Sequence, residues 1–202
     1  MKRQPVSRPK LTVVRGGWSS MPDEELVRSQ LRGELGAAEE ICRRYGRDAE
    51  RMVIRICGFT PERHDILQEV FLRILARLHT LREPSALRSW VVSIAVRCAR
   101  EHLRQRRRRL RLVDSKSDVP APADPEASAL LRRAYSLLDR LHPDDRVAFL
   151  LRTVEGLTLQ EIADTTGSSL ATTKRRVRRG AEHFRKIARR DLLLSHHVPE
   201  DG

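Results

Sequence analysis

Apolar residues recur at intervals of three and four along nearly every segment of this chain. No stretch of strand length shows the strict two-residue alternation of a half-buried strand. The pattern is clearest between Pro61 and Leu78, where one side of a helix carries a wide apolar stripe: Ile66, Leu67, Val70, Phe71, Ile74, Leu75 and Leu78. Similar spacing predicts helices within 23–58, from about Leu87, over 130–141 and from Pro143. The predicted fold class is therefore all-α.

A change in composition near the middle of the chain divides these helices into two lobes. Between Arg97 and Arg111 the sequence holds eight Arg and one acidic residue, Glu101. The segment that follows is acidic and too rich in Pro for a helix interior, which predicts a flexible linker. The predicted order is a flexible basic arm (1–22), a first helical domain (23–111), an acidic Pro-rich linker (112–129), a second helical domain (130–192) and a flexible tail (193–202).

The charge of the chain limits its partners. Lys and Arg outnumber Asp and Glu by 40 to 27, and the resulting net charge of +13 attracts polyanions. Ribosomal and membrane-surface proteins share this balance, so charge by itself leaves the partner open. No apolar run approaches the roughly 20 residues of a membrane span, and the basic N-terminus lacks the apolar core of a signal peptide. We therefore expect a cytoplasmic protein without membrane insertion.

The three cysteines and seven histidines give no sign of a metal or catalytic centre. Cys42, Cys57 and Cys98 lack CxxC spacing, which argues against a disulfide framework and a cysteine-built zinc site. The histidines show no ligand spacing, and the chain has no Gly-rich phosphate loop. An enzyme acting on nucleic acid is thus disfavoured, and no catalytic residue, metal ligand or cofactor is predicted.

The segment after Gly156 has the pattern of a helix-turn-helix. Thr158 and Glu161 form a capping-box sequence, Gly167 permits a left-handed turn, and Ser169 is suited to cap the next helix. On a helical wheel, the inner side of that helix carries Leu170, Thr173, Val177, Ala181 and Phe184. The outer side carries Ala171, Thr172, Arg175, Arg178 and Arg179.

A basic face with small residues at the start of a second helix is what reading of the DNA major groove requires. Arginine can contact guanine edges, and the neighbouring Lys174, Arg176 and Arg185 are suited to neutralising phosphates. The competing interpretation is a solvated basic helix at the end of a bundle. The capping box, the Gly turn and the small Ala163 at the expected helix crossing favour DNA binding.

Together these segments resemble the sigma-70 family, specifically its extracytoplasmic-function branch, over about residues 24–190. Residues 65–73 resemble the region 2 motif that docks on the clamp of the polymerase β′ subunit. Residues 88–95 are similar to the segment that leads into −10 recognition and strand opening. Residues 141–158 resemble the start of region 4, and 161–176 resemble its −35-reading motif.

The resemblance implies an alternative sigma factor that binds core RNA polymerase, through its beta and beta-prime subunits, and directs promoter-specific transcription initiation. Core binding would fall to Asp65, Gln68, Glu69, Phe71 and Arg73. Contact with −10 DNA would fall to Trp90, Arg97, Arg100, Arg104, Arg106, Arg107 and Arg108. Contact with −35 DNA would fall to Ala171, Thr172, Lys174, Arg175, Arg176, Arg178 and Arg179. The sequence leaves open whether an anti-sigma factor is a further partner.

Several alternatives remain open from the residues alone. An aromatic face can stack on an unpaired base, but Trp90 also fits a core position. The Arg106–Arg109 run can hold a DNA backbone by counterion release, or it can be an unstructured basic tail. Arg97 stands where the family usually has Asn, and Ser168 and Thr173 where apolar residues are usual. A stand-alone helix-turn-helix regulator on a sigma-like scaffold is the alternative function.

Overall fold

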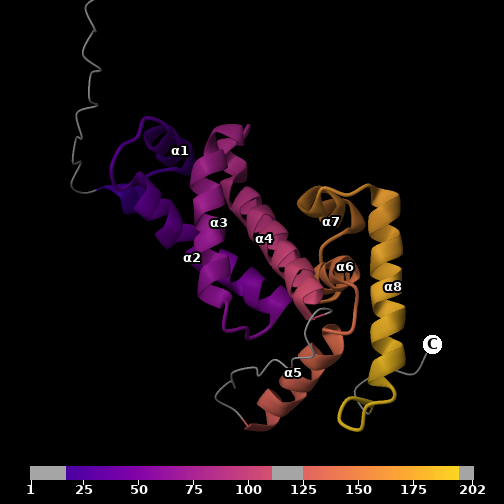
Figure 1. The fold of residues 1–202 in the computed structure, drawn as a ribbon. Helices are drawn as coiled ribbons and strands as arrows, with labels where there is room; N and C mark the ends of the chain where they lie inside the picture. The colour runs from indigo at the N-terminus through magenta and orange to yellow at the C-terminus, as the bar shows by residue number, and fades with distance from the viewer. Residues whose placement is uncertain (1–16, 111–124, 196–202) are drawn as a thin grey trace, which may run out of the picture.

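The computed structural model describes residues 17–110 and 125–195, and every regular element in these ranges is helical, as predicted (Figure 1). The α-helices of these ranges are α1 (Asp23–Leu31), α2 (Ala37–Cys57), α3 (Arg63–Arg77), α4 (Leu87–Leu110), α5 (Pro125–Leu138), α6 (Pro143–Thr153), α7 (Leu159–Thr166) and α8 (Leu170–Ala188). Short 3-10 helices are η1 (Trp18–Ser20), η2 (Leu78–Thr80) and η3 (Pro84–Ala86). None of these helices is both long and apolar enough to cross a membrane.

Helices α2, α3 and α4 pack on one another to form the first lobe, and α1 packs on α2 (Figure 1). The stripe predicted for α3 buries Ile66, Val70 and Ile74 against the other two helices. On α4, the side chains that enter the same core are Val91, Ile94, Ala95 and Cys98. Trp90 is half-buried at the edge of the same core. The helical spacing of apolar residues was thus a sound guide to this lobe.

The turn between α7 and α8 has the local geometry that the sequence predicts. The Thr158 hydroxyl accepts a hydrogen bond from the backbone N–H of Glu161, and the Glu161 carboxylate accepts one from the Thr158 N–H at 2.7 Å. Gly167 follows in the left-handed region at φ +63°. Ser169 Oγ then accepts from the Thr172 N–H at 3.2 Å, which caps α8. The helix-turn-helix therefore follows from capping and turn chemistry within a few residues.

The two lobes pack against each other through α4. Helices α6 and α7 contact α4, while α8 packs on the other side of α6 and α7 (Figure 1). Apolar residues of the second lobe belong to the same buried cluster as the core of the first lobe: Val147, Ala148, Leu151 and Ile162. The Tyr135 hydroxyl of α5 also donates across the lobes to the backbone carbonyls of Ile54 and Arg55, each at 3.1 Å. This shared core was not expected for two lobes on a flexible linker.

Helix α5 begins earlier than the sequence predicts, within the predicted linker. The helix begins at Pro125 and ends at Leu138, whereas the sequence pattern suggested 130–141. A Pro at the first helical position loses only an N–H that would be unpaired there, so it can begin a helix. The prediction of a linker is therefore wrong for residues 125–129, and residues 112–124 lie outside the described residues.

The last residues of the predicted N-terminal arm belong to the folded lobe. The Arg44 guanidinium of α2 donates to the Trp18 carbonyl at 3.1 Å and to the Met21 carbonyl at 2.9 Å. Gly36, at φ +98°, allows the Trp18 indole to approach closely, because a Cβ there would lie 2.7 Å from the indole nitrogen. The prediction of a flexible arm is wrong for residues 17–22, and residues 1–16 lie outside the described residues.

The predicted C-terminal tail also begins with ordered residues. The Asp191 carboxylate accepts from the backbone N–H groups of Leu193 and Leu194 and pairs with Arg133 of α5. These bonds fold the chain back beside α5, so residues 193–195 extend the second lobe. Residues 196–202 lie outside the described residues.

We expect Gly180→Ala to destabilise the second lobe, although Ala favours a helix more than Gly. Gly180 lies where α8 crosses α6, and a Cβ there would meet the Asp145 carbonyl oxygen at 2.7 Å and Phe149 Cβ at 2.8 Å. Overpacking and the gain in helix propensity oppose each other, which leaves a net loss of about 1–2 kcal/mol in urea unfolding. Gly46→Ala is the matched control, because its Cβ would meet only Phe71 Cζ, at 3.5 Å. Equal stability of the two variants would show that the crossing tolerates a methyl group.

Candidate nucleic-acid interface

The outer face of α8 is the most exposed of the predicted DNA-binding surfaces. Ala171, Lys174, Arg175 and Arg178 are exposed there. On the inner side Thr173 and Gly180 are buried, and Val177, Ala181 and Phe184 are half-buried. The wheel prediction fails only for Leu170, which is 49% exposed because it lies at the first position of the helix, beyond the crossing with α6. A row of small and basic side chains therefore faces outward at the N-terminal half of α8.

Two of the arginines predicted for −35 DNA are instead tied to α6 in this structure. Arg176 is only 19% exposed, and it donates to Ser168 Oγ at 2.6 Å and to Asp144 Oδ2 at 3.2 Å. Arg179 donates to Asp145 Oδ1 at 2.8 Å, although much of its side chain remains exposed. Both acids lie in the first turn of α6. The wheel placed Arg179 correctly on the outer side, but it gave no sign of either ion pair.

The second lobe contacts the basic face of α4, although Arg97, Arg104 and Arg108 on that face stay exposed. Arg97 Nε donates to the Thr165 carbonyl at 3.3 Å, and Arg100 Nη1 donates to the Thr166 carbonyl at 2.8 Å. These carbonyls end α7, where the helix dipole is negative. Further along α4, Arg107 Nη1 donates to the Leu141 carbonyl at 3.0 Å. Three of the arginines predicted for −10 DNA thus bind backbone carbonyls of the second lobe.

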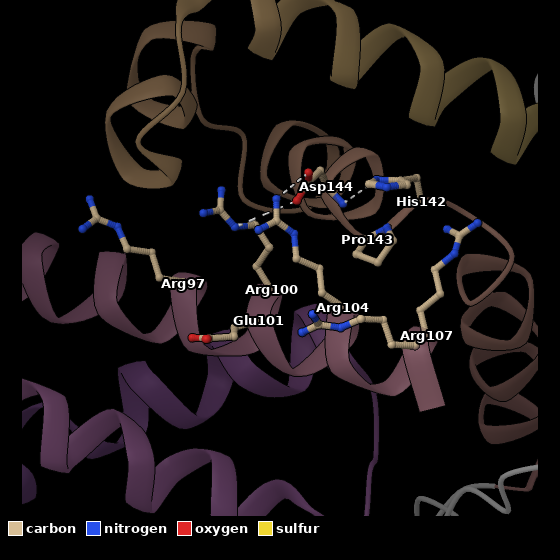
Figure 2. Close-up of a pocket in the computed structure, with 9 residues that line it drawn as sticks. Arg97, Arg100, Glu101, Arg104, Arg107, His142, Pro143 and Asp144 are labelled. Carbon is tan, nitrogen blue, oxygen red and sulfur yellow. Dashed lines mark hydrogen bonds and ion pairs between the residues drawn. The ribbon is translucent and has the colours of Figure 1, made fainter. Parts of the chain in front are cut away.

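Asp144 lies at the centre of this arrangement (Figure 2). Its Oδ2 accepts from Arg104 Nη2 at 2.7 Å, and its Oδ1 lies 4.0 Å from Arg100 Nε. Burial alone would raise the pKa of the Asp144 carboxyl. The hydrogen bond from Arg104 and the charges of Arg176, Arg104 and Arg100 outweigh burial and hold the pKa below its usual value. The carboxylate is therefore ionised and joins arginines of α4 and α8.

A cleft of about 600 Å³ opens beside Asp144, between α4 and the start of α6 (Figure 2). It is lined by Arg97, Arg100, Glu101, Arg104, Arg107, Arg108, His142, Pro143 and Asp144. Arg108 is exposed, whereas Arg106 lies outside the cleft, half-buried, and forms an ion pair with Asp139 at 3.0 Å. The basic run is helical to Leu110, so the alternative of an unstructured tail is excluded for residues 97–110. The cleft is cationic, as a surface for phosphates requires.

Trp90 lies away from this cleft, on the N-terminal part of α4. Its side chain is half-buried against the core of the first lobe, and it also lines a shallow depression with Glu161 and Asp164 of α7. Trp90 thus packs on the edge of the core and keeps part of its side chain exposed, and stacking on an unpaired base stays a prediction.

The outer face of α3 is an exposed ridge over a rigid apolar base. Asp65, Gln68 and Glu69 are exposed on it, as predicted. Phe71 turns inward instead, where it packs on the core near Gly46. The next residue, Leu72, is 57% exposed on the ridge. The sequence pattern did not single out Leu72, although its spacing from Asp65 and Glu69 places it on the same side of a helix.

Arg73 connects the ridge to α4. It donates to Glu69 of its own helix and to Glu101 of α4, at 2.7 Å for the second contact. The hydrogen bond to Glu101 is the larger influence raising the pKa of Arg73, and the bond to Glu69 adds to it. Arg73 is therefore a cross-brace between two helices as well as a member of the exposed surface.

The described residues hold no cluster of His, Cys, Asp and Glu that is suited to a metal ion. Cys57 and Cys98 are buried and Cys42 is half-buried, and all three are free thiols. Burial raises the pKa of the Cys57 thiol to about 12 and that of Cys98 to about 11, which keeps both protonated and unreactive near neutral pH. Cys57 and Cys98 belong to the core of the first lobe.

The comparison with known families explains why these surfaces occur together. Residues 41–109 match the family model of sigma-70 region 2, and residues 131–184 match that of sigma-70 region 4. The RNA polymerase sigma factor CarQ of Myxococcus xanthus is 30% identical over 159 residues, which are 77% of this chain and 91% of that protein. The chain belongs to the sigma-70 family. Helix α3 and all of α4 but its last residue lie in the region 2 match. The helix-turn-helix of α7 and α8 lies within the region 4 match, apart from the last residues of α8.

Other relatives of this sigma-70 chain are of the extracytoplasmic-function type. The ECF RNA polymerase sigma factor SigE of Mycolicibacterium smegmatis is 26% identical over 165 residues, covering 78% of this chain and 62% of that protein. In fold, the chain is similar to the sigma factor RpoE of Bartonella quintana, solved in complex with the anti-sigma factor NepR. The TM-score is 0.57 at 19% identity, over 76% of this chain and 97% of RpoE. The prediction of an all-α sigma fold of the extracytoplasmic-function type is confirmed.

Proposed function

We propose that this chain is an extracytoplasmic-function sigma factor that binds core RNA polymerase and directs it to specific promoters. The observation that carries the proposal is that regions 2 and 4 occur in one chain, and that each presents an outward surface suited to its role. Polymerase supplies the chemistry of transcription, so the chain itself is not an enzyme. It works where the polymerase works, in the cytoplasm.

Three surfaces divide the work in this proposal. The α3 ridge of Asp65, Gln68, Glu69 and Leu72 docks on polymerase, because it offers polar groups around an exposed apolar side chain. The basic face of α4, with Trp90 at its start, takes −10 DNA, where arginine holds phosphates and the indole can stack on an unpaired base. The outer face of α8 reads −35 DNA from the major groove.

In this proposal, three residues have roles other than those implied by the resemblance: Phe71, Arg73 and Arg176. Arg73 braces α3 against α4, and Phe71 supports the ridge from inside. Arg176 reaches DNA only if it leaves Asp144. An anti-sigma factor is a further partner in this proposal, supported by the RpoE complex with NepR.

Run-off transcription with core polymerase on a genomic promoter library tests the proposal. We expect discrete transcripts that need both the chain and core polymerase. The stand-alone regulator makes the opposite prediction, because it would protect promoter DNA without polymerase and would fail to recruit core enzyme in a pull-down. A pull-down without core polymerase, together with no sigma-dependent transcript, would overturn the proposal.

A further inference from the structure

We infer that a small monovalent anion, chloride or one of similar size, binds beside the buried side chain of Arg146. The place is a hollow between the C-terminal part of α4 and the start of α6, which we name the Arg146 hollow. Its lining residues are Leu103, Arg106, Arg107, Asp139, Leu141, Pro143 and Arg146. The inference is independent of the proposed function, because it concerns a ligand of the folded chain and neither polymerase nor promoter DNA.

The side chain of Arg146 lies inside the protein with donors to spare. Arg146 belongs to α6 and is only 2% exposed. Its Nη1 donates to Asp139 in the turn between α5 and α6. Its Nε and Nη2 are buried, and they find no hydrogen-bond acceptor among the residues that the structure describes. A buried guanidinium N–H without an acceptor is destabilising, because it has lost water and gained nothing in return. A molecule that accepts from these two groups would therefore stabilise the fold.

The Arg146 hollow has the size of a small ion. Its volume is about 50 Å³. A cavity of about 10–15 Å³ already holds one water molecule, so this one admits a small ion or a few waters. It is too small for a nucleotide. Figure 2 shows two of its lining residues, Arg107 and Pro143, where α4 approaches the start of α6.

The charges that line the hollow favour an anion over water. Its described lining holds three guanidinium groups and one carboxylate. Asp139 accepts from Arg106 at 3.0 Å as well as from Arg146, so one acid serves two arginines. Arg107 donates only to a neutral group, the Leu141 carbonyl, at 3.0 Å. Water could accept from the free donors of Arg146, but an anion would also balance the excess positive charge.

The other lining residues indicate which kind of anion fits. Leu103, Leu141 and Pro143 contribute apolar walls, which cannot replace the water shell of a strongly hydrated ion. Chloride and bromide give up water more readily than fluoride, and both are only slightly larger than a water molecule. Gluconate, a six-carbon anion, is too large for the hollow. The expected order of binding is therefore chloride and bromide before fluoride, with gluconate excluded.

Thermal unfolding of the full-length protein tests this order. Sodium gluconate is replaced stepwise by sodium chloride at constant ionic strength, so that general screening does not change. We expect Tm to rise by about 3–5 °C for each tenfold increase in chloride above its dissociation constant, as binding to the folded state alone requires. Bromide should give a similar rise, and fluoride should give little.

Two methionine variants of α6 separate binding in the hollow from a general effect of salt. Arg146→Met keeps an apolar stem but removes the guanidinium, so its Tm should no longer depend on chloride. Arg152→Met is the matched control, because Arg152 lies on the same helix outside the hollow and donates to the Leu157 carbonyl at 2.9 Å. It should keep the chloride dependence of the wild type. If Arg146→Met folds poorly, Arg106→Gln lowers the positive charge of the hollow instead and should weaken the dependence.

A crystal of the wild-type protein grown in bromide would locate the ion directly. We expect an anomalous bromide peak within hydrogen-bond distance of Arg146 Nε or Nη2. Density there without an anomalous signal would mean that water fills the hollow, and it would overturn the inference. The inference also fails if Tm responds to chloride equally in the wild type and in the variant that lacks an arginine of the hollow. A bromide peak with no chloride dependence of Tm would show an adventitious ion only. None of these results bears on the run-off experiment, so the two proposals fail separately.

Discussion

Replacing Leu72 with Asp is expected to weaken binding to core RNA polymerase by about 30-fold or more, the loss typical of an interface hot spot of about 2 kcal/mol. Leu72 is 57% exposed and lies among the polar residues of the α3 ridge. An exposed large apolar side chain ringed by polar groups is suited to fill a pocket on a partner and to exclude water there. A carboxylate at this position would be buried without a partner in the complex.

The control for this variant is Leu31→Asp at the end of α1. Leu31 is 55% exposed, close to the value for Leu72, and it lies on α1 and not on α3. Both variants should unfold in urea at the same denaturant concentration as the wild type, because neither side chain is in the core. Titration of labelled protein with core polymerase should separate them. Equal affinity of Leu72→Asp and Leu31→Asp for core polymerase would remove α3 from the docking surface.

Charge reversal at Arg73 is a less direct test of polymerase binding by α3 than Leu72→Asp. Arg73 donates to Glu101 of α4 as well as to Glu69 of its own helix. An acidic residue at position 73 would face Glu101 across the two helices and strain the lobe. Loss of polymerase binding in such a variant would then have two explanations, whereas Leu72 makes no such brace in the described contacts.

Much of the fold could be predicted from the sequence because the patterns that define each helix lie within that helix. The stripe of Ile66, Val70 and Ile74 defines the inner side of α3 through spacing alone. The capping box of Thr158 and Glu161 marks the start of α7 within four residues. Spacing and capping patterns of this kind are properties of a single helix. They can therefore be recognised without knowing how the neighbouring helices are placed.

The contacts between the lobes were not predictable, because they depend on how whole helices are placed. Asp144 in the sequence is an ordinary acid at a helix start, which the helix dipole already explains. Its contacts with Arg104 and Arg176 join residues 40 and 32 positions apart. From the sequence, Val147 and Leu151 could be buried in the core of their own lobe or against the first lobe. The structure places them in the buried cluster of the first lobe. Amphipathic spacing shows that a face is buried but not which partner buries it.

Arg175→Ala in the holoenzyme is expected to cost about 1–3 kcal/mol of promoter affinity and to relax the preference at one base pair of the −35 element. Arg175 is exposed on the outer face of α8, and its described side-chain contact is a long one of 3.5 Å to Thr172 Oγ1. The guanidinium is therefore available for a bidentate contact with a guanine edge. Footprint titrations on promoters that differ at single −35 positions would measure both effects.

Two other arginines of the second lobe serve as controls for this test. Arg190→Ala removes the same charge beyond the end of α8, so it should weaken binding slightly and equally on all sequences. Arg176→Ala should mainly lower the stability of the second lobe, because Arg176 is bonded to Ser168 and Asp144 inside the protein. If Arg175→Ala weakens every −35 sequence to the same extent, Arg175 contacts a phosphate and the reading of a base belongs to another residue of α8. A change in preference at one base pair, absent from both controls, assigns that base to Arg175.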